Sequence, residues 1–298
     1  YGAPCGLIVS RQKHPTTIVY ALLSGEEQGL HGGRLLADYA AEQGWQVKAV
    51  LNNGIVGNSC GSDGYCDPVH VRVFSEGPRA DLTDALRADQ RRNGGENDSP
   101  GRNLSRWLDG LAGVFPSGLD VRQIWRTDRM GRGGDQIPFL EKGYPAIRFS
   151  VAVEDYDHQH QDLREEDGVT YGDTVYEMDF TYLAKVTQLN IRALARLART
   201  PMPPAVKVAA AVSTDTEVSW DAVAGAQTYV VWQRRTDDPA WWPEPVLRIP
   251  AAGADDAGPA PHYGAILAGV RGDDWIFGVS AGSAEDLCSP ASSGVPAG

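Results

Sequence analysis

The first two hundred residues alternate between continuous apolar runs and apolar residues at helical spacing. Residues 16–23 and 47–52 are runs rich in β-branched side chains, which predicts two strands buried on both faces. Between them, residues 35–40 place apolar side chains at the spacing of a helix. The stretch from 16 to 52 therefore predicts a strand–helix–strand unit.

The same alternation continues as far as residue 198. A dense cluster of turn and capping residues at 97–100 precedes one of the predicted helices. Further strands are predicted at 69–75, 121–125 and 146–150, and helices at 79–92, 101–114, 136–142 and 180–198. This order predicts an α/β fold, a three-layer α/β/α domain around a mixed, mostly parallel sheet.

The pattern changes after a proline-rich linker at 200–204, since dense prolines end a helix and stiffen a connection. Short strands then follow one another without a helical signal, at 206–212, 217–220, 228–233, 246–249, 263–267 and 275–281. This succession predicts an all-β sandwich. Ser219-Trp220 on an early strand and residues 229–232 on the next are similar to a fibronectin type III domain. We therefore expect one domain at 1–200 and a fibronectin type III-like domain at 204–298.

The charge and composition of the chain argue against several classes of binding partner. The 298 residues carry a net charge of −12, with 42% hydrophobic and 22% charged residues, which argues against extended disorder. Because the charge is negative and basic runs are absent, we expect no nucleic-acid partner and no binding to anionic membranes. No run approaches the roughly 18 apolar residues of a membrane span. The chain opens at Tyr1 without a signal peptide, so we expect a processed product or a fragment.

The sequence has four cysteines, and whether they pair indicates whether the protein belongs to an oxidising or a reducing compartment. Cys60 and Cys66 bracket a glycine-rich loop, a spacing that favours a small disulfide-closed loop, with two free thiols as the alternative. Cys5 and Cys288 lie far apart in the sequence and can pair only if the two domains pack closely. A disulfide, an acidic composition and few lysines fit a secreted, extracellular protein.

Three short motifs suggest extracellular contacts, but each is weak. Asn97 and Asn103 begin formal glycosylation sequons, a pattern that often arises by chance. Residues 271–273 form an Arg-Gly-Asp tripeptide, which is more often a polar turn than an integrin ligand. Residues 241–243 form a Trp-Trp-Pro cluster that could stack on a sugar or peptide, or fold back over the sandwich.

The pair Glu26-Glu27 carries the chemistry of the first domain. Two adjacent carboxylates follow the run at 16–23, and the carboxyl ends of strands are where open α/β sheets place ligands. There, one carboxylate can bind a metal while its neighbour takes a proton from a metal-bound water. The alternative from the residues alone is a glutamate-rich surface turn.

A family resemblance favours the metal site. Residues 21–32 resemble the Glu-Glu motif of the co-catalytic zinc exopeptidases of the bacterial aminopeptidase type, peptidase family M28. Segments at 49–53, 72–77, 128–135, 144–149, 158–162 and 171–173 agree with that family in the same order. The resemblance implies zinc as cofactor, a peptide substrate, Glu26 as general base and Glu27 as a zinc ligand. It implies His160 as the distal histidine ligand, with His158 as the alternative register.

The chain also departs from the family pattern. The family carries a His-x-Asp segment upstream of the Glu-Glu motif, and this sequence begins downstream of that point. Gly54 stands where the family has an aspartate ligand, and the neighbouring Asn53 is a poor substitute for a carboxylate. Gln136 replaces a histidine, and Val151 stands where related sequences tend to be acidic. Two side chains cannot hold two zinc ions, because one catalytic zinc normally uses three protein ligands.

These observations support two main hypotheses. In the first, the chain is a zinc aminopeptidase-like protein with an incomplete metal site, inactive as this chain. In the second, it is part of an active zinc-dependent aminopeptidase whose remaining ligands lie upstream of residue 1. A third alternative is an extracellular structural or assembly module that reuses the peptidase fold, through protein or glycan contacts or self-assembly.

Overall fold

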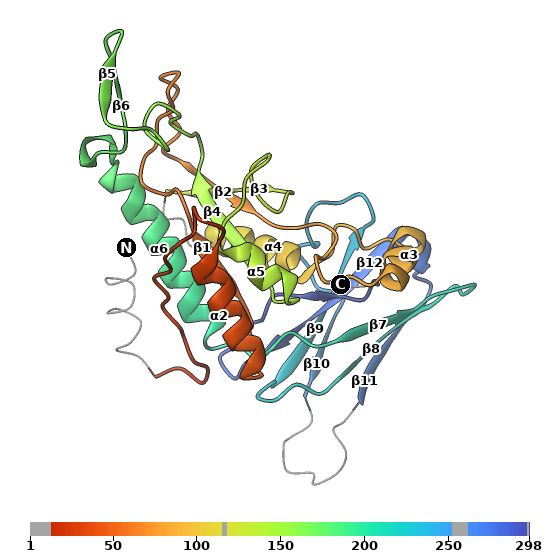
Figure 1. Ribbon diagram of the computed structural model, residues 1–298. Helices are drawn as coiled ribbons and strands as arrows, with labels where there is room; N and C mark the ends of the chain where they lie inside the picture. Colours follow the sequence, from red (N-terminus) through yellow and green to blue (C-terminus); the bar gives the residue numbers. More distant parts are fainter. Residues whose placement is uncertain (1–12, 115–117, 252–261, 297) are drawn as a thin grey trace.

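The computed structural model describes residues 13–114, 118–251, 262–296 and 298. It is a mixed α/β structure with one mixed sheet and several antiparallel sheets (Figure 1). The mixed sheet has the order β1-β4-β2-β3, made by Val50–Asn53, Ala146–Val151, His70–Phe74 and Asp120–Ile124. β1 pairs with β4 and β2 with β3 in parallel, whereas β2 and β4 are antiparallel. The prediction of a mixed, mostly parallel sheet is therefore confirmed.

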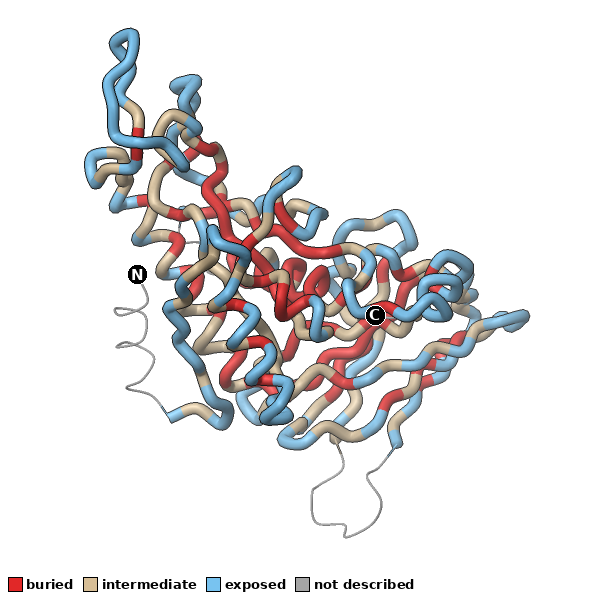
Figure 2. Tube along the Cα trace, viewed as in Figure 1, coloured by how far each residue is buried: buried red, intermediate tan, exposed pale blue. Residues whose placement is uncertain are grey.

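Strand β4 lies at the centre of the packing, and all six of its residues are buried. Ile147, Phe149 and Val151 join the main core with α4 (Pro100–Val114) and α6 (Phe180–Leu197). Ala146 joins a second cluster with α2 (His31–Glu42) and α5 (Gln136–Glu141). Successive strand residues point to opposite faces, so one pair of helices covers each face of the sheet. The buried trace in Figure 2 follows these strands and α4.

The predicted strand at 16–23 is wrong. No strand is formed there, and Val19 and Leu22 are 52% and 91% exposed. In this stretch Thr16 Oγ1 donates to the carbonyl of Ala198 (2.9 Å). A β-branched run becomes a strand only where a neighbouring strand takes its backbone hydrogen bonds. β1 is the edge of the sheet within the described residues, and no pairing with 16–23 is present.

The other predicted elements of the first part are confirmed within a few residues. The helix predicted at 79–92 begins later, as α3 (Asp84–Asn93), with Thr83 accepting from the backbone N–H of Leu86 as its N-cap. A hairpin of β5 (Arg164–Glu166) and β6 (Val169–Tyr171), followed by a short helix η1 (Val175–Glu177), was not predicted. Each strand of the hairpin has three residues, which is too short to show the alternation of apolar and polar residues that predicts a strand.

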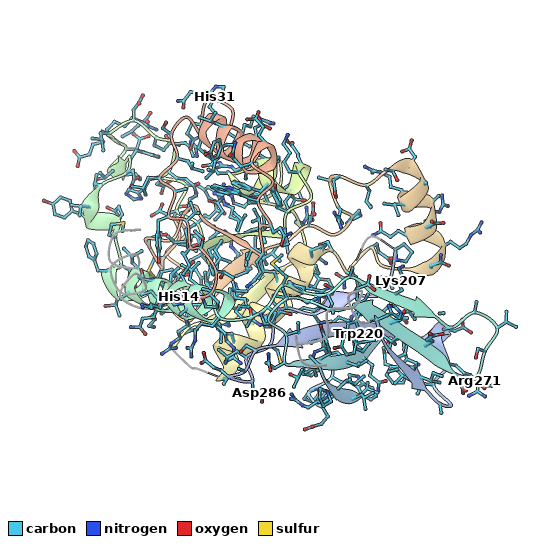
Figure 3. All side chains as sticks on the ribbon, turned by 90° about the horizontal axis from the view of Figure 1, so that it is seen from below. His14, His31, Lys207, Trp220, Arg271 and Asp286 are labelled. Carbon is cyan, nitrogen blue, oxygen red and sulfur yellow. A yellow bond between two sulfur atoms is a disulfide. The ribbon has the colours of Figure 1, made fainter. Side chains whose placement is uncertain are left out.

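The C-terminal part is built from two antiparallel sheets, as the strand succession predicts. One has the order β10-β9-β12-β13 and the other β11-β8-β7. Side chains of both sheets share one core, in which Trp220 stacks on Tyr263 and packs against Tyr229. Trp220 is labelled in Figure 3, among these strands. The strands are β7 (Val206–Ala209), β8 (Thr216–Asp221), β9 (Thr228–Arg235), β10 (Leu247–Pro250), β11 (His262–Leu267), β12 (Trp275–Gly282) and β13 (Ser292–Ser293), with a short helix η2 (Gly272–Asp274) before β12.

Helix α4 joins the two parts of the chain. Arg106 Nε donates to the carbonyl of Pro239 (2.7 Å), and Trp107 Nε1 donates to the carbonyl of Cys288 (3.1 Å). Asn103 is buried and donates to Ser293 Oγ (2.9 Å). A glycan on Asn103 is incompatible with this packing, so the sequon there is not a modification site in the folded chain.

The structure also bears on the cysteines, the tryptophan loop and the Arg-Gly-Asp tripeptide. Cys60 and Cys66 form a disulfide, Cys288 is a free thiol, and Cys5 lies outside the described residues. Trp242 packs edge-on against Trp275 at 4.8 Å, so the tryptophan loop folds back over the sandwich. Arg271 precedes η2 in a polar turn far from α2 and its His31 (Figure 3). No helix in the described ranges combines the length and apolarity needed to cross a bilayer.

Candidate active-site pocket

Glu26 and Glu27 lie in a turn directly before α2. The carbonyl of Glu26 accepts hydrogen bonds from the backbone N–H groups of Gly29 and Leu30, at 3.1 and 2.9 Å. Gly32 N donates to the carbonyl of Ser24 (3.0 Å), and a Cβ at position 32 would lie 2.7 Å from that same oxygen. The close approach therefore requires glycine at position 32 and fixes the two carboxylates at the entrance to the helix.

A pocket of about 650 Å³ brings the sequence-predicted residues together. It collects side chains from the Glu-Glu turn, the end of β1, the loop before α5, β4 and the loop that follows β4. Its lining residues are Glu26, Glu27, Gly29, Leu30, Asn52, Asn53, Gly54, Ile55, Arg129, Arg132, Gly133, Asp135, Arg148 and His160.

The candidate ligands Glu27 and His160 face each other in this pocket. Nε2 of His160 is 3.5 Å from Oε1 of Glu27, and both side chains are about half exposed. The backbone of His160 has a φ of 56°, a left-handed conformation that non-glycine residues seldom adopt. Such conformations concentrate at functional sites, and here the conformation accompanies the orientation of the ring towards Glu27.

His158 lies in a different cluster. Its Nδ1 is 2.8 Å from Oδ2 of Asp155, and its Nε2 is 3.4 Å from Oε1 of Glu177. Within the described ranges, these three residues are the one group of three or more His, Cys, Asp or Glu whose ligand atoms lie within 4.8 Å of one another. None of the three lines the pocket. Of the two histidine registers left open by the sequence, the structure brings His160 into the pocket and leaves His158 outside it.

Gly54 has Arg148 where its side chain would be. A Cβ added to Gly54 would lie 2.7 Å from Cζ and 2.8 Å from Nε of Arg148, with Nη2 closer still. The guanidinium group is held there by Asp128, whose Oδ2 accepts from Nη1 at 3.0 Å, and by the carbonyl of Gly133. The volume of a ligand side chain at position 54 is thus filled by a cation from β4.

A buried polar network, which the sequence pattern did not predict, supports Arg148. Gln136 is fully buried, donates to Asp128 Oδ2 (2.6 Å) and accepts from Asn52 Nδ2 (2.7 Å). Arg148 itself is only 3% exposed. A charged residue inside the apolar run of β4 is the signal that could have revealed the network, because a buried charge needs a partner.

Two departures noted in the sequence have a structural counterpart. The Asn53 amide is engaged with the amide of Asn190 of α6, in reciprocal hydrogen bonds of 3.0 and 3.1 Å. Because its amide is paired with Asn190, the Asn53 side chain does not replace the metal ligand that is missing at position 54. Val151 is completely buried in the main core and does not line the pocket.

The pocket carries charges of both signs. Burial raises the pKa of Glu26, the charge of Glu27 raises it further, and the cation of Arg148 opposes the shift. Burial also raises the pKa of Asp135, while a hydrogen bond from the backbone N–H of Gly33 and the cation of Arg148 oppose the shift. Arg129 forms ion pairs with Asp128 and Glu154, at 3.2 and 3.1 Å, so it is an internal salt-bridge residue.

Comparison with known proteins gives a consistent set of relatives. No family model matches the chain. A probable zinc metalloprotease of Leptosphaeria maculans is 41% identical over 234 residues, covering 77% of this chain and 54% of that protein. The similarity supports a zinc metallopeptidase family. A probable zinc metalloprotease from Pyrenophora teres f. teres is 35% identical over 291 residues, and another from Pyrenophora tritici-repentis is 33% identical over 288 residues.

These two longer matches cover 95% of this chain, and 57% and 64% of the relatives. The metalloprotease similarity therefore extends through most of the C-terminal sheets as well as the pocket-bearing part. The chain spans about half to two-thirds of the length of these metalloprotease relatives.

Proposed function

We propose that this chain carries the pocket of a zinc-dependent aminopeptidase of the co-catalytic exopeptidase type, with a metal site that is incomplete in this chain. The observation that carries the proposal is the meeting of Glu26, Glu27 and His160 in one pocket, in a chain similar to probable zinc metalloproteases. In this proposal Glu26 is the general base, and Glu27 and His160 are zinc ligands. The substrate class is a peptide with a free amino terminus.

The donor set in the pocket does not fit a complete zinc site by itself. Glu27 and His160 offer two ligand atoms, and no third His, Cys, Asp or Glu among the described residues converges with them within 4.8 Å. A catalytic zinc ion uses three protein ligands. At position 54 the structure has glycine and the cation of Arg148, which repels a metal ion. We therefore assign no hydrolytic step to this chain and propose that it is inactive as it stands.

The architecture that we propose has two domains, an exopeptidase-like three-layer domain at 1–200 and a fibronectin type III-like sandwich at 204–298. Helix pairs on both faces of the mixed sheet support the first. Two antiparallel sheets around one core support the second. We also propose that the protein is secreted, since the Cys60–Cys66 disulfide fits an oxidising compartment.

Zinc content and hydrolysis test the proposal together. The chain would be purified without chelators, its zinc measured by mass spectrometry, and its hydrolysis of leucine p-nitroanilide followed at neutral pH. We expect substoichiometric zinc and no chelator-sensitive hydrolysis. Two zinc ions per chain with chelator-sensitive turnover would overturn the assignment, and would favour an active aminopeptidase with ligands outside the described residues.

A further inference from the structure

The guanidinium group of Arg148 has two nitrogen atoms, Nε and Nη2, that donate no hydrogen bond to a described residue. The residue is 3% exposed, and Nη1 donates to Asp128 and to the carbonyl of Gly133. Nε is buried without a hydrogen-bond partner in the described ranges, and no described residue accepts from Nη2. A buried donor without a partner costs about 1–3 kcal/mol, so the vacant edge points to a ligand.

The guanidinium group packs against Gly54 at the wall of the pocket. Nε and Nη2 are among the atoms nearest to the place of a Cβ on Gly54, and Gly54 and Arg148 both line the pocket. These two nitrogens are the parallel donors with which arginine binds a carboxylate in a bidentate manner. A side chain at position 54 would displace the guanidinium group, whereas glycine leaves room for it beside the pocket.

The rest of the pocket suits the other groups of an amino acid. Glu26, Glu27 and Asp135 supply negative charge that complements an ammonium group, while Leu30 and Ile55 offer apolar surface. We propose that the pocket binds a free amino acid, with its carboxylate on the Nε–Nη2 edge of Arg148 and its ammonium group facing the glutamates. A small rotation of the guanidinium group, with Nη1 still bonded to Asp128, presents both donors to the ligand.

The inference rests on the peptidase-like pocket proposed above, but it requires neither zinc nor hydrolysis. The test is therefore isothermal titration calorimetry in the presence of a chelator, with L-leucine as the probe. L-leucinamide keeps the ammonium group and the side chain but lacks the carboxylate. 4-Methylpentanoate keeps the carboxylate and the side chain but lacks the ammonium group.

We expect L-leucine to bind at least about tenfold more tightly than L-leucinamide, because a charge-assisted bidentate contact is lost in the amide. 4-Methylpentanoate should also bind more weakly than L-leucine. Equal affinity for L-leucine and L-leucinamide, or no binding of L-leucine, would overturn the proposal. Either result leaves the zinc and hydrolysis measurements unaffected, so the two proposals can fail separately.

Gly54→Ala tests the geometry while keeping both residues of the Asp128–Arg148 ion pair. The added Cβ would crowd Cζ and Nε of Arg148, so we expect L-leucine affinity to fall at least about tenfold. Gly110→Ala on α4 is the matched control, since a Cβ at Gly110 meets no atom within 4 Å. Unchanged L-leucine affinity in Gly54→Ala, or an equal loss in both variants, would contradict a carboxylate site at Arg148.

Discussion

Asp98 and Arg234 form a buried ion pair although they are 136 positions apart in the sequence, with 2.6 Å between Oδ2 and Nη2. Both side chains are at most 2% exposed. Ser293 Oγ donates to the other oxygen of Asp98 at 2.8 Å, and Arg106 Nη1 lies 3.9 Å from it. The carboxylate two residues before α4 thus binds a cation of β9 and a hydroxyl of β13, which links the C-terminal sheets to the first part.

Asp98→Asn should destabilise the whole chain. The substitution preserves shape but removes the charge that compensates Arg234, and a buried charge without its partner costs about 3–5 kcal/mol. We expect the free energy of unfolding, measured by urea denaturation and circular dichroism, to fall by that amount.

The exposed pair of Arg235 and Asp274, at 3.7 Å, provides the control. Asp274→Asn removes a surface salt bridge, and such pairs contribute about 0–1 kcal/mol. If Asp98→Asn and Asp274→Asn cost the same, Asp98 does not hold the two parts together.

Glu76 should make stability depend on pH near neutrality. Burial raises the pKa of Glu76 from 4.5 to about 7, and Asp81 adds to the shift, while the Ala80 N–H, Arg79 and Arg102 oppose it. Because the pKa is higher in the folded state, the favourable contribution of the protonated form is complete below about pH 4.5. It is lost as the pH rises through 7.

Glu76→Gln removes this dependence while keeping an oxygen that can accept from Ala80 N–H. Between pH 4.5 and 8, wild type should lose roughly 3 kcal/mol relative to Glu76→Gln, as measured by urea unfolding at each pH. The exposed Glu96→Gln is the control and should follow the wild-type profile. Parallel profiles for wild type and Glu76→Gln would show that burial does not shift Glu76.

The Cys60–Cys66 disulfide should contribute modestly to stability. It closes a loop between residues six positions apart. Closing a loop of this size lowers the conformational entropy of the unfolded chain, which stabilises the folded state by about 2 kcal/mol. The double variant Cys60→Ser, Cys66→Ser should lose about that much in urea unfolding. Wild type in a reductant should fall to the same value, and a wild type indifferent to reductant would contradict the prediction.

Much of the fold follows from local patterns in the sequence. Strand β4 could be placed because its apolar run is short and bounded by turn residues, and α6 because its apolar period persists over 18 residues. The run at 16–23 has the same local pattern as β4 but forms no strand. Strand formation requires a hydrogen-bonding neighbour, and a single segment carries no information about its neighbours.

In the pocket, too, some features follow from the local sequence and others depend on residues that are distant in the sequence. Glu26 and Glu27 are adjacent in the sequence, so a local motif identifies them as a pair. Arg148 acts through Gly54 and Asp128, which are 94 and 20 positions away, and only the sheet register brings these three residues together. The choice between His158 and His160 also depends on the path of a loop, which the sequence leaves open.

Gly54→Asp should strengthen zinc binding. The new carboxylate would join Glu27 and His160 in the same pocket and would neutralise or displace the guanidinium group of Arg148, whose positive charge repels a metal ion. We expect the dissociation constant for zinc, measured by calorimetry at pH 7.5, to fall at least about tenfold relative to wild type.

Gly54→Asn separates charge from size. Its side chain crowds Arg148 as much as aspartate does, but an amide oxygen is a poor ligand for zinc and leaves the guanidinium charge uncompensated. Zinc affinity should therefore rise in Gly54→Asp and stay at the wild-type value in Gly54→Asn. If both variants behave like wild type, glycine at position 54 is not what limits the metal site. If both bind zinc more tightly, moving Arg148 aside is sufficient and the carboxylate itself is not a ligand.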